Sequence, residues 1–235
     1  MTVLAIDSAT PTASAALWRD GELVASFRAA AGSTHSECLL PMIEKALEVC
    51  EIGVADLDLI ACGVGPGSFT GVRIGVATAK GLAAPRGIPC VGVSSLEAAA
   101  YPLSCAEGLV VPAFNARRGN VYTAIFSASR GAIERLTDDA IISVGELCET
   151  LAAYRKPVHF AGDAAREVFA AAKDAGLDAI PVADGAILPD AGAICAVAAA
   201  RYEDAGEDGR RAYTAEALAP TYLRPGRAGN AALPE

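Results

Sequence analysis

Histidine is scarce in this sequence, with only His35 and His159 among 235 residues. Neither has a second ligand at metal-binding spacing, and the seven cysteines are widely spaced without a CxxC pair. A structural zinc site is therefore not expected. A Ser-His-Asp triad is also not favoured, because only two histidines are available as its base. The cysteines are odd in number and lie mostly within apolar runs, so we expect reduced core residues of a cytoplasmic protein.

Positive charge is also in short supply. The chain has 19 Lys and Arg residues against 28 Asp and Glu residues, a formal net charge of −9. A protein that grips a nucleic-acid backbone unaided needs a clustered basic face, so any nucleic-acid role is expected to require a partner. The sequence starts on a strand-like run without a basic leader, and no apolar stretch reaches membrane-spanning length. Secretion and membrane insertion are not expected.

The first half of the sequence has enough patterned apolar residues for a packed α/β unit, within a chain that is 53% hydrophobic. Three short β-rich runs predict an antiparallel meander, and helices and strands are then expected to alternate. The predicted elements are strands at Val3–Asp7, Ser14–Trp18 and Glu22–Phe27, a helix from Ser36 to Cys50 after a capping box of Thr34 and Glu37, a strand at Leu57–Val64, a helix at about Thr70–Ala84, a strand at Pro89–Val93 and a helix from Ser95.

The second half begins with a similar pattern. The predicted elements are a hairpin of Leu109–Asn115 and Val121–Phe126 with Gly119 in its turn, a strand at Ala132–Leu136, a helix at Val144–Ala153, a strand at Val158–Ala161 and helices at Ala164–Asp174 and Ala191–Glu203. We predict two α/β lobes, at residues 1–100 and 101–225, with the last helix able to pack back on the first lobe. Residues 226–235 lack periodicity and are expected to fray.

Residues Gly63 to Gly75, which read GVGPGSFTGVRIG, connect a predicted strand to a predicted helix and are called the glycine elbow here. Glycine permits the tight turn, Ser68 or Thr70 can cap the helix, and backbone N–H groups there could hold an anion. Val72 and Arg73 stand where a Walker A loop needs Lys and Ser/Thr, and the third glycine comes one residue late for GxGxxG. An anion site and an elbow that serves packing alone both stay open.

Four segments together resemble the TsaB (YeaZ) family: Ala5–Thr10 (AIDSAT), Gly65–Gly75 (GPGSFTGVRIG), Asn115–Tyr122 (NARRGNVY) and Pro220–Arg224 (PTYLR). The resemblance runs from Met1 to about Arg224. It implies an actin-like, Hsp70-like (ASKHA) fold of two lobes. It also implies a non-catalytic role in bacterial threonylcarbamoyladenosine synthesis, next to the anticodon of tRNAs that read ANN codons.

The resemblance also implies partners. These are TsaD, the paralogue that carries the metal and the transfer site, and the ATPase TsaE, so this chain alone would bind no cofactor, and ATP, ADP and the metal would belong to the partner subunits. tRNA would be reached only through the complex. In the catalytic paralogue two histidines four residues apart bind the metal, and the matching positions here are Ser95 and Ala99, which cannot replace imidazoles.

Several residues remain candidates for an anion or nucleotide contact within the complex. Asp7 follows the first strand, where many actin-like ATPases place a Mg²⁺-linked carboxylate, although capping of the turn is the simpler role. Arg117 and Arg118 lie in the hairpin turn, where they are either solvated charge or a phosphate contact. The family usually has an acidic residue in place of Asn115 and often of Asn120. The candidate anion contacts are Asp7, Ser68, Thr70, Arg73, Arg117 and Arg118.

The two helices of the first lobe are the predicted partner interface. Gly71, Gly75 and Ala79 form a small-residue stripe that could admit another helix, although the same stripe could pack on its own sheet. The residues predicted for the interface are Leu39, Met42, Ile43, Leu47, Gly71, Val72, Gly75 and Ala79. The occupant would be the TsaD-type paralogue or, in competition, a second copy of this chain. The alternative function is a stand-alone metal-dependent peptidase or ATP-dependent kinase of the same fold.

Overall fold

The computed structural model describes residues 1–30, 35–181 and 188–223. The described chain divides into two compact units. Unit 1 comprises Met1–Ala98 and Pro189–Thr221, and the described residues of Ala99–Leu188, with 222–223, form unit 2. The predicted capping residue Thr34, the motif residue Arg224 and the tail at 226–235 lie outside the described residues.

Unit 1 is built on a five-stranded sheet in the order β3-β2-β1-β4-β5. The strands are β1 (Thr2–Asp7), β2 (Thr12–Arg19), β3 (Glu22–Ala30), β4 (Leu59–Gly63) and β5 (Cys90–Val93). The first three strands form the predicted antiparallel meander, while β4 and β5 run parallel to β1. The carboxyl ends of β1, β4 and β5 therefore meet at one edge of the sheet.

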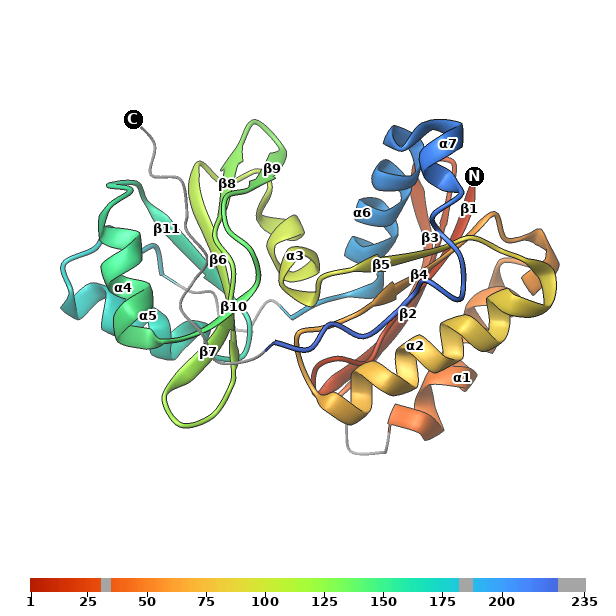
Figure 1. Cartoon of the computed structure of the whole chain (residues 1–235), viewed down its shortest axis with the longest axis horizontal. Coiled ribbons are helices and arrows are strands. Elements are labelled where there is room, and N and C mark those ends of the chain that lie inside the picture. Colours follow the sequence, from red (N-terminus) through yellow and green to blue (C-terminus); the bar gives the residue numbers. More distant parts are fainter. Residues whose placement is uncertain (31–34, 182–187, 224–235) are drawn as a thin grey trace. The chain divides into compact units, whose positions relative to one another are not determined.

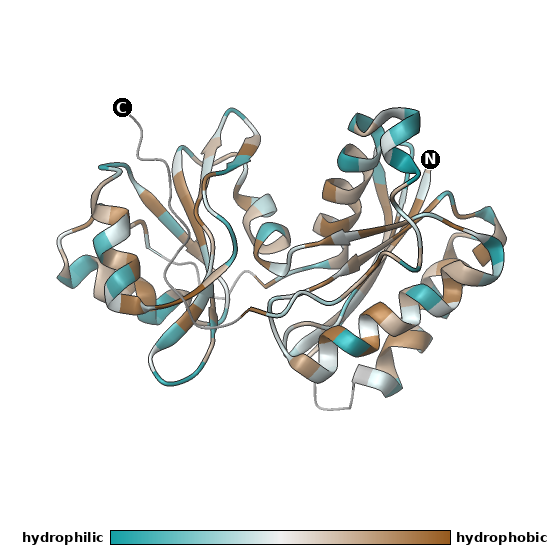
Figure 2. Cartoon of the chain, viewed as in Figure 1, coloured by the Kyte–Doolittle hydropathy of each residue, from teal (hydrophilic) through white to brown (hydrophobic). Residues whose placement is uncertain are grey.

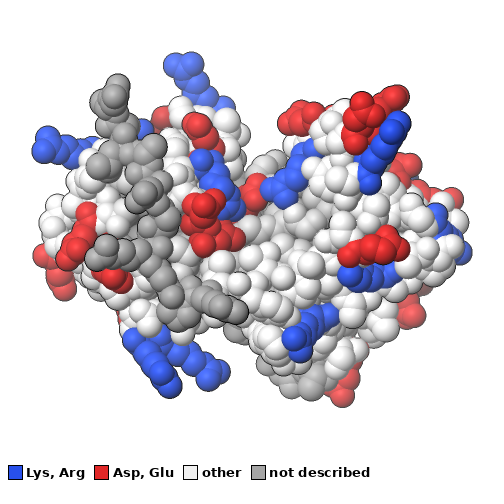
Figure 3. Space-filling model, in the orientation of Figure 1, with Lys and Arg blue, Asp and Glu red and all other residues white. Residues whose placement is uncertain are grey.

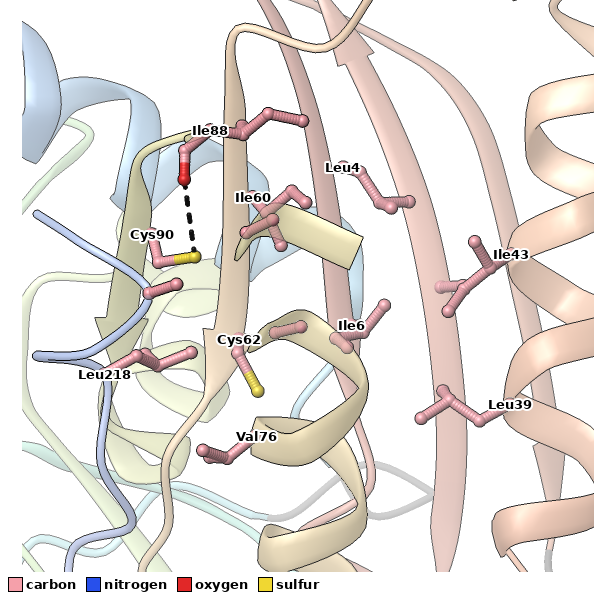
Figure 4. Close-up of a cluster of buried hydrophobic side chains, with 14 of the residues drawn as sticks. Leu4, Ile6, Leu39, Ile43, Ile60, Cys62, Val76, Ile88, Cys90 and Leu218 are labelled. Carbon is pink, nitrogen blue, oxygen red and sulfur yellow. Dashed lines mark hydrogen bonds between the residues drawn. The ribbon is translucent and has the colours of Figure 1, made fainter. Parts of the chain in front are cut away.

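Helices cover both faces of this sheet (Figure 1). The helices of unit 1 are α1 (His35–Val49), α2 (Phe69–Ala83), α6 (Ala191–Asp204) and α7 (Gly206–Arg210), and α3 (Ser95–Ala100) crosses its boundary with unit 2. One core lies under α1 and α2, where Leu39, Ile43 and Val76 meet Ile6 and Ile60 of the sheet (Figure 4). A second core lies under α6 on the opposite face.

Unit 2 contains a second sheet, in the order β10-β7-β6-β8-β9, with β11 paired to β6. Its elements are β6 (Gly108–Asn115), β7 (Asn120–Thr123), β8 (Phe126–Ser129), β9 (Ala132–Arg135), β10 (Ala140–Ser143), α4 (Val144–Ala152), β11 (Val158–Ala161) and α5 (Ala165–Asp174). Helices α4 and α5 pack their apolar sides onto this sheet around Leu109, Leu147 and Val168. Figure 2 shows the apolar residues concentrated on the strands and the inner sides of the helices.

The observed elements follow the sequence predictions closely, with two kinds of difference. Strand β10 and the short helix α7 were not predicted, and the single predicted strand Val121–Phe126 is divided between β7 and β8. The prediction also counted residues 101–225 with the second lobe, whereas Pro189–Thr221 belongs to unit 1. Within this segment α6 packs on β1 and β2, as the prediction allowed for the last helix. Among the described residues, no helix combines the length and apolar character needed to cross a membrane.

Candidate functional site

The glycine elbow lies at the carboxyl edge of the unit 1 sheet. Strand β4 ends at Gly63, the chain turns at Gly65 with a φ of +95°, and α2 begins at Phe69. The Ser68 hydroxyl caps the helix by accepting a hydrogen bond from the Gly71 N–H at 3.2 Å. Of the two predicted capping residues, Ser68 therefore performs this role.

Backbone groups of the elbow are hydrogen-bonded within the chain from three directions. The Ser68 N–H donates to the Ala9 carbonyl oxygen at 2.7 Å, which ties the elbow to the β1–β2 turn. The Gly65 and Val64 carbonyl oxygens accept from the N–H groups of Ser95 and Thr221, each at 2.8 Å. The N–H groups of Ser68 and Gly71, two of those expected to hold an anion, are thus already engaged. This geometry favours the packing interpretation of the elbow.

The elbow glycines allow the β1–β2 turn to lie directly on α2. A Cβ atom on Gly67 would stand 2.2 Å from the Ala9 oxygen, and one on Gly71 would stand 1.9 Å from the Ser8 oxygen. The Ser8 hydroxyl also donates to the Gly71 carbonyl oxygen at 2.8 Å. A Cβ on Gly75 would lie 2.8 Å from the same hydroxyl oxygen. Each of these approaches excludes a larger side chain.

The small-residue stripe therefore packs on its own sheet rather than facing outward, which corrects the reason given for the predicted interface. Gly71, Gly75 and Ala79 are buried against the β1–β2 turn and β4. Four further predicted interface residues that are buried or packed in the same core are Leu39, Ile43, Val72 and, partly, Leu47. Fully buried side chains cannot contact a partner, so an interface here would depend on their exposed neighbours.

Exposed apolar side chains do flank this core. Leu40 on α1 is 49% exposed and Phe69 at the start of α2 is 55% exposed, while Met42 is half-buried. The Arg73 guanidinium carbon lies 3.7 Å from the centre of the Phe69 ring, a cation–π contact. Sequence reasoning missed Leu40 and Phe69. The available signal was an apolar residue at a position that helical periodicity assigns to solvent.

Asp7 is fully buried at the end of β1. Its Oδ1 accepts a long hydrogen bond of 3.4 Å from the Ala9 N–H, and its Oδ2 has no hydrogen-bond partner among the described residues. Burial, followed by the negative charge of Asp190, raises the pKa of Asp7 to about 7. Gly63 makes room for the carboxyl group, since a Cβ there would stand 2.0 Å from Oδ1. The predicted turn-capping contact is present.

The second candidate feature lies in unit 2, at the turn between β6 and β7. Arg117 and Arg118 are exposed and adopt left-handed backbone angles, with φ of +67° and +55°. The Asn115 side-chain oxygen accepts from the Arg117 N–H at 2.7 Å, which holds the turn. The turn is therefore fixed in shape and presents both arginines to solvent. Thr70, the remaining candidate, is exposed in the first turn of α2.

Within the described ranges, no group of three or more His, Cys, Asp or Glu side chains could hold a metal ion. Ser95 and Ala99, the two positions that the family resemblance singles out, are both fully buried. The seven cysteines are reduced thiols, and six are buried or half-buried while Cys105 is exposed. Burial raises the pKa of Cys90 to about 11, which makes it a poor nucleophile at neutral pH.

Comparisons with known proteins agree with the sequence motifs. A family model described as "TsaD: tRNA N6-adenosine threonylcarbamoyltransferase" matches residues 29–228. A Bacillus subtilis relative named tRNA threonylcarbamoyladenosine biosynthesis protein TsaB is 38% identical over 162 residues, 69% of this chain and 71% of that protein. The chain belongs to the TsaB (YeaZ) family. An Escherichia coli relative of the same name is 40% identical over 57% of this chain and 58% of that protein.

Solved structures of the TsaB (YeaZ) family extend the similarity over nearly the whole chain. A Pseudomonas aeruginosa protein described as similar to peptidase YeaZ is 28% identical, with a TM-score of 0.78 over 95% of this chain and 99% of that chain. A dehydratase component from Acidaminococcus fermentans has a TM-score of 0.50 at 13% identity, over 88% of this chain and all of that chain. At 13% identity, the similarity to the dehydratase component concerns the fold alone. Together they confirm the predicted actin-like α/β fold class.

Proposed function

We propose that this TsaB-family chain is a non-catalytic subunit required for threonylcarbamoyl transfer to tRNA. A role in tRNA threonylcarbamoyladenosine biosynthesis follows from the relatives that carry that name. In the proposed complex, a TsaD-type paralogue performs the transfer to the adenosine beside the anticodon, and a TsaE-type ATPase joins the assembly. The chain itself contributes a binding surface, and tRNA is reached through the complex in the cytoplasm.

The observation that supports a non-catalytic role most directly is the closed glycine elbow. Its Ser68 and Gly71 N–H groups are bonded within the chain, and the β1–β2 turn lies directly on α2. A nucleotide phosphate at this edge needs free N–H groups and an open turn. We therefore assign ATP, ADP and the metal to the partner subunits, and the purified chain is expected to bind neither stoichiometric metal nor nucleotide.

The proposed partner surface is the exposed rim of α1 and α2. Leu40 and Phe69 are large apolar side chains left half open to solvent, and Arg73 stacks on the Phe69 ring. Phenylalanine and arginine are both enriched at protein interfaces relative to the rest of the surface. The buried residues Leu39, Ile43 and Val72 fix the positions of both helices from below. A second copy of this chain would bury the same rim and so would compete with the catalytic partner.

The function is tested by reconstituting threonylcarbamoyl transfer from purified components, with and without this chain. The TsaD-type and TsaE-type partners, ATP, the threonylcarbamoyl donor and unmodified tRNA are supplied in both reactions. We expect product only when the chain is present, and no transfer by the chain alone. Equal rates in both reactions would exclude a required role. Transfer, peptidase or ATPase activity of the isolated chain would instead favour an enzyme of the same fold.

A further inference from the structure

The turn between β6 and β7 carries unpaired positive charge. The segment Asn115–Asn120, which reads NARRGN, has two arginines and no acidic residue. Among the described residues, neither the Arg117 nor the Arg118 guanidinium has an ion pair or a hydrogen bond. Figure 3 shows basic side chains projecting at the lower left, over the region where Figure 1 places this hairpin turn. The turn is therefore a local positive site on an acidic protein.

The backbone of the turn is fixed in advance of any binding. The Ala116 N–H donates to the Asn120 carbonyl oxygen at 3.0 Å, and the Asn120 N–H donates to the Arg117 carbonyl oxygen at 3.1 Å. The Gly119 carbonyl oxygen accepts from the Val144 N–H at 3.3 Å, which ties the turn to the start of α4. The backbone of Asn115 is also fixed, because its N–H donates to Asp163 Oδ1 at 2.8 Å. Little backbone conformational entropy would therefore be lost when a ligand binds.

Two adjacent guanidinium groups on a rigid turn are suited to phosphate. Each is planar and permanently charged, and it can donate two parallel hydrogen bonds to phosphate oxygens. We propose that Arg117 and Arg118 form a contact with the phosphate backbone of tRNA in the assembled complex. This inference rests on the proposed function, because a chain with a net charge of −9 cannot retain RNA by two arginines alone. The rest of the RNA surface must come from its partners.

An acidic protein surface is the other class of ligand that this turn could attract. RNA is favoured because the apolar rim proposed for protein contact lies on α1 and α2 of unit 1, whereas this turn has exposed charge without an exposed large apolar side chain within Asn115–Asn120. Protein interfaces need a desolvated apolar centre, while phosphate contacts are polar and wet.

The test measures the affinity of the reconstituted complex for unmodified tRNA between about 50 and 200 mM KCl. Removing a phosphate contact weakens RNA binding and makes the negative slope of log affinity against log salt shallower by about 1. The double variant Arg117→Ala, Arg118→Ala should therefore lose about two units of slope. The affinity ratio of wild type to variant then shrinks about 16-fold across this salt range. Double replacement by Lys should preserve the slope, because the charge remains.

Arg130→Ala is the matched control. Arg130 is also an exposed arginine of unit 2 with a left-handed φ of +53°, in the turn between β8 and β9. Its backbone N–H donates to Glu107 Oε1 at 3.3 Å, so a carboxylate lies beside this turn. This variant should keep the wild-type slope. The phosphate contact would be overturned if the double alanine variant kept the wild-type slope of log affinity against log salt. It would also be overturned if the variant lost assembly with the partner subunits instead of tRNA affinity. Those outcomes leave the proposed function standing, because it fails if transfer proceeds without the chain or if the isolated chain is itself active.

Discussion

At the residue scale, Asp7 stands out among the described residues as a buried carboxyl group with an unsatisfied oxygen atom. A buried carboxylate normally accepts several hydrogen bonds, yet Asp7 Oδ2 has no partner within the described part of the chain. Its pKa of about 7 reflects burial first and the Asp190 charge second, opposed by Arg28 and by N–H groups of Ala9 and Ser8. Below neutral pH the group is therefore neutral in the folded chain, and above it the fold must contain a buried charge.

Stability should consequently fall as pH rises. The pKa of Asp7 is about 7 when folded against an ordinary value of 3.8, so the folded state binds the extra proton between these values. Its contribution is fully present below about pH 4 and is lost as the pH approaches about 7. Relative to Asp7→Asn, wild type should lose on the order of 3 kcal/mol of unfolding free energy between about pH 5 and pH 8. Urea unfolding of both proteins across this range measures the difference, and parallel pH curves would contradict it.

The sequence identified the residues of the elbow but not the direction in which they face. Ser68 and Thr70 were equal capping candidates from residue type, and only the backbone path selects Ser68. Asp7 was correctly predicted to contact its own turn. Its raised pKa depends on burial beside Gly63 and on the charge of Asp190, far along the chain, which local patterns cannot reveal.

At the element scale, most helices and strands follow from periodicity, and the misses have local causes. The predicted strand Val121–Phe126 is interrupted opposite Pro112 of β6, which has no N–H to donate. At this break the Ile125 N–H donates to Thr137 Oγ1, and its carbonyl oxygen accepts from the Leu136 N–H, each at 2.8 Å. Strand β7 pairs with residues 113–115 of β6, and β8 pairs with residues 108–110 on the other side of that proline. The unpredicted β10 reads AIIS, which shows no alternation of polar and apolar residues.

The small-residue stripe shows a limit of helical patterns. Its spacing correctly indicated a close approach to α2, but the approaching backbone is the β1–β2 turn of the same chain. Periodicity gives a smooth helix face without stating what lies on it. A larger residue at Gly75 would therefore test the fold rather than assembly.

Two glycines of α2 provide a matched test of this packing. Gly71→Ala places a Cβ 1.9 Å from the Ser8 backbone oxygen, whereas a Cβ on the exposed Gly81 would meet nothing within 4 Å. We expect Gly71→Ala to destabilise the chain by about 1 to 3 kcal/mol through overpacking. Gly81→Ala should stabilise it by up to about 1 kcal/mol through helix propensity. Chemical denaturation compares them, and equal effects would mean that the β1–β2 turn does not rest on α2.

At the scale of the whole molecule, two compact units share one chain whose C-terminal segment returns to the first. Residues Pro189–Thr221 add α6 to one face of the unit 1 sheet, and Thr221 bonds the glycine elbow. The sequence analysis counted this segment with the second lobe but allowed its last helix to pack back on the first, and α6 does pack there. The elbow is thus held by segments from the start, middle and end of the chain. Such a closed elbow is consistent with a subunit that acts by assembly rather than chemistry.

The central claim is that this chain acts by binding a catalytic partner through the α1 and α2 rim. Leu40→Glu on α1 and Leu23→Glu on β3 alter leucines that are each 49% exposed. The two variants therefore introduce the same charge at equal exposure, and only Leu40 lies on the proposed partner surface. The decisive measurement is the rate of threonylcarbamoyl transfer at fixed partner concentration as each variant is titrated. Leu40→Glu should require at least about tenfold more chain for half-maximal rate yet reach the wild-type plateau, while Leu23→Glu should match wild type throughout. A lowered plateau with saturating, folded Leu40→Glu, or an equal shift for Leu23→Glu, would contradict this account.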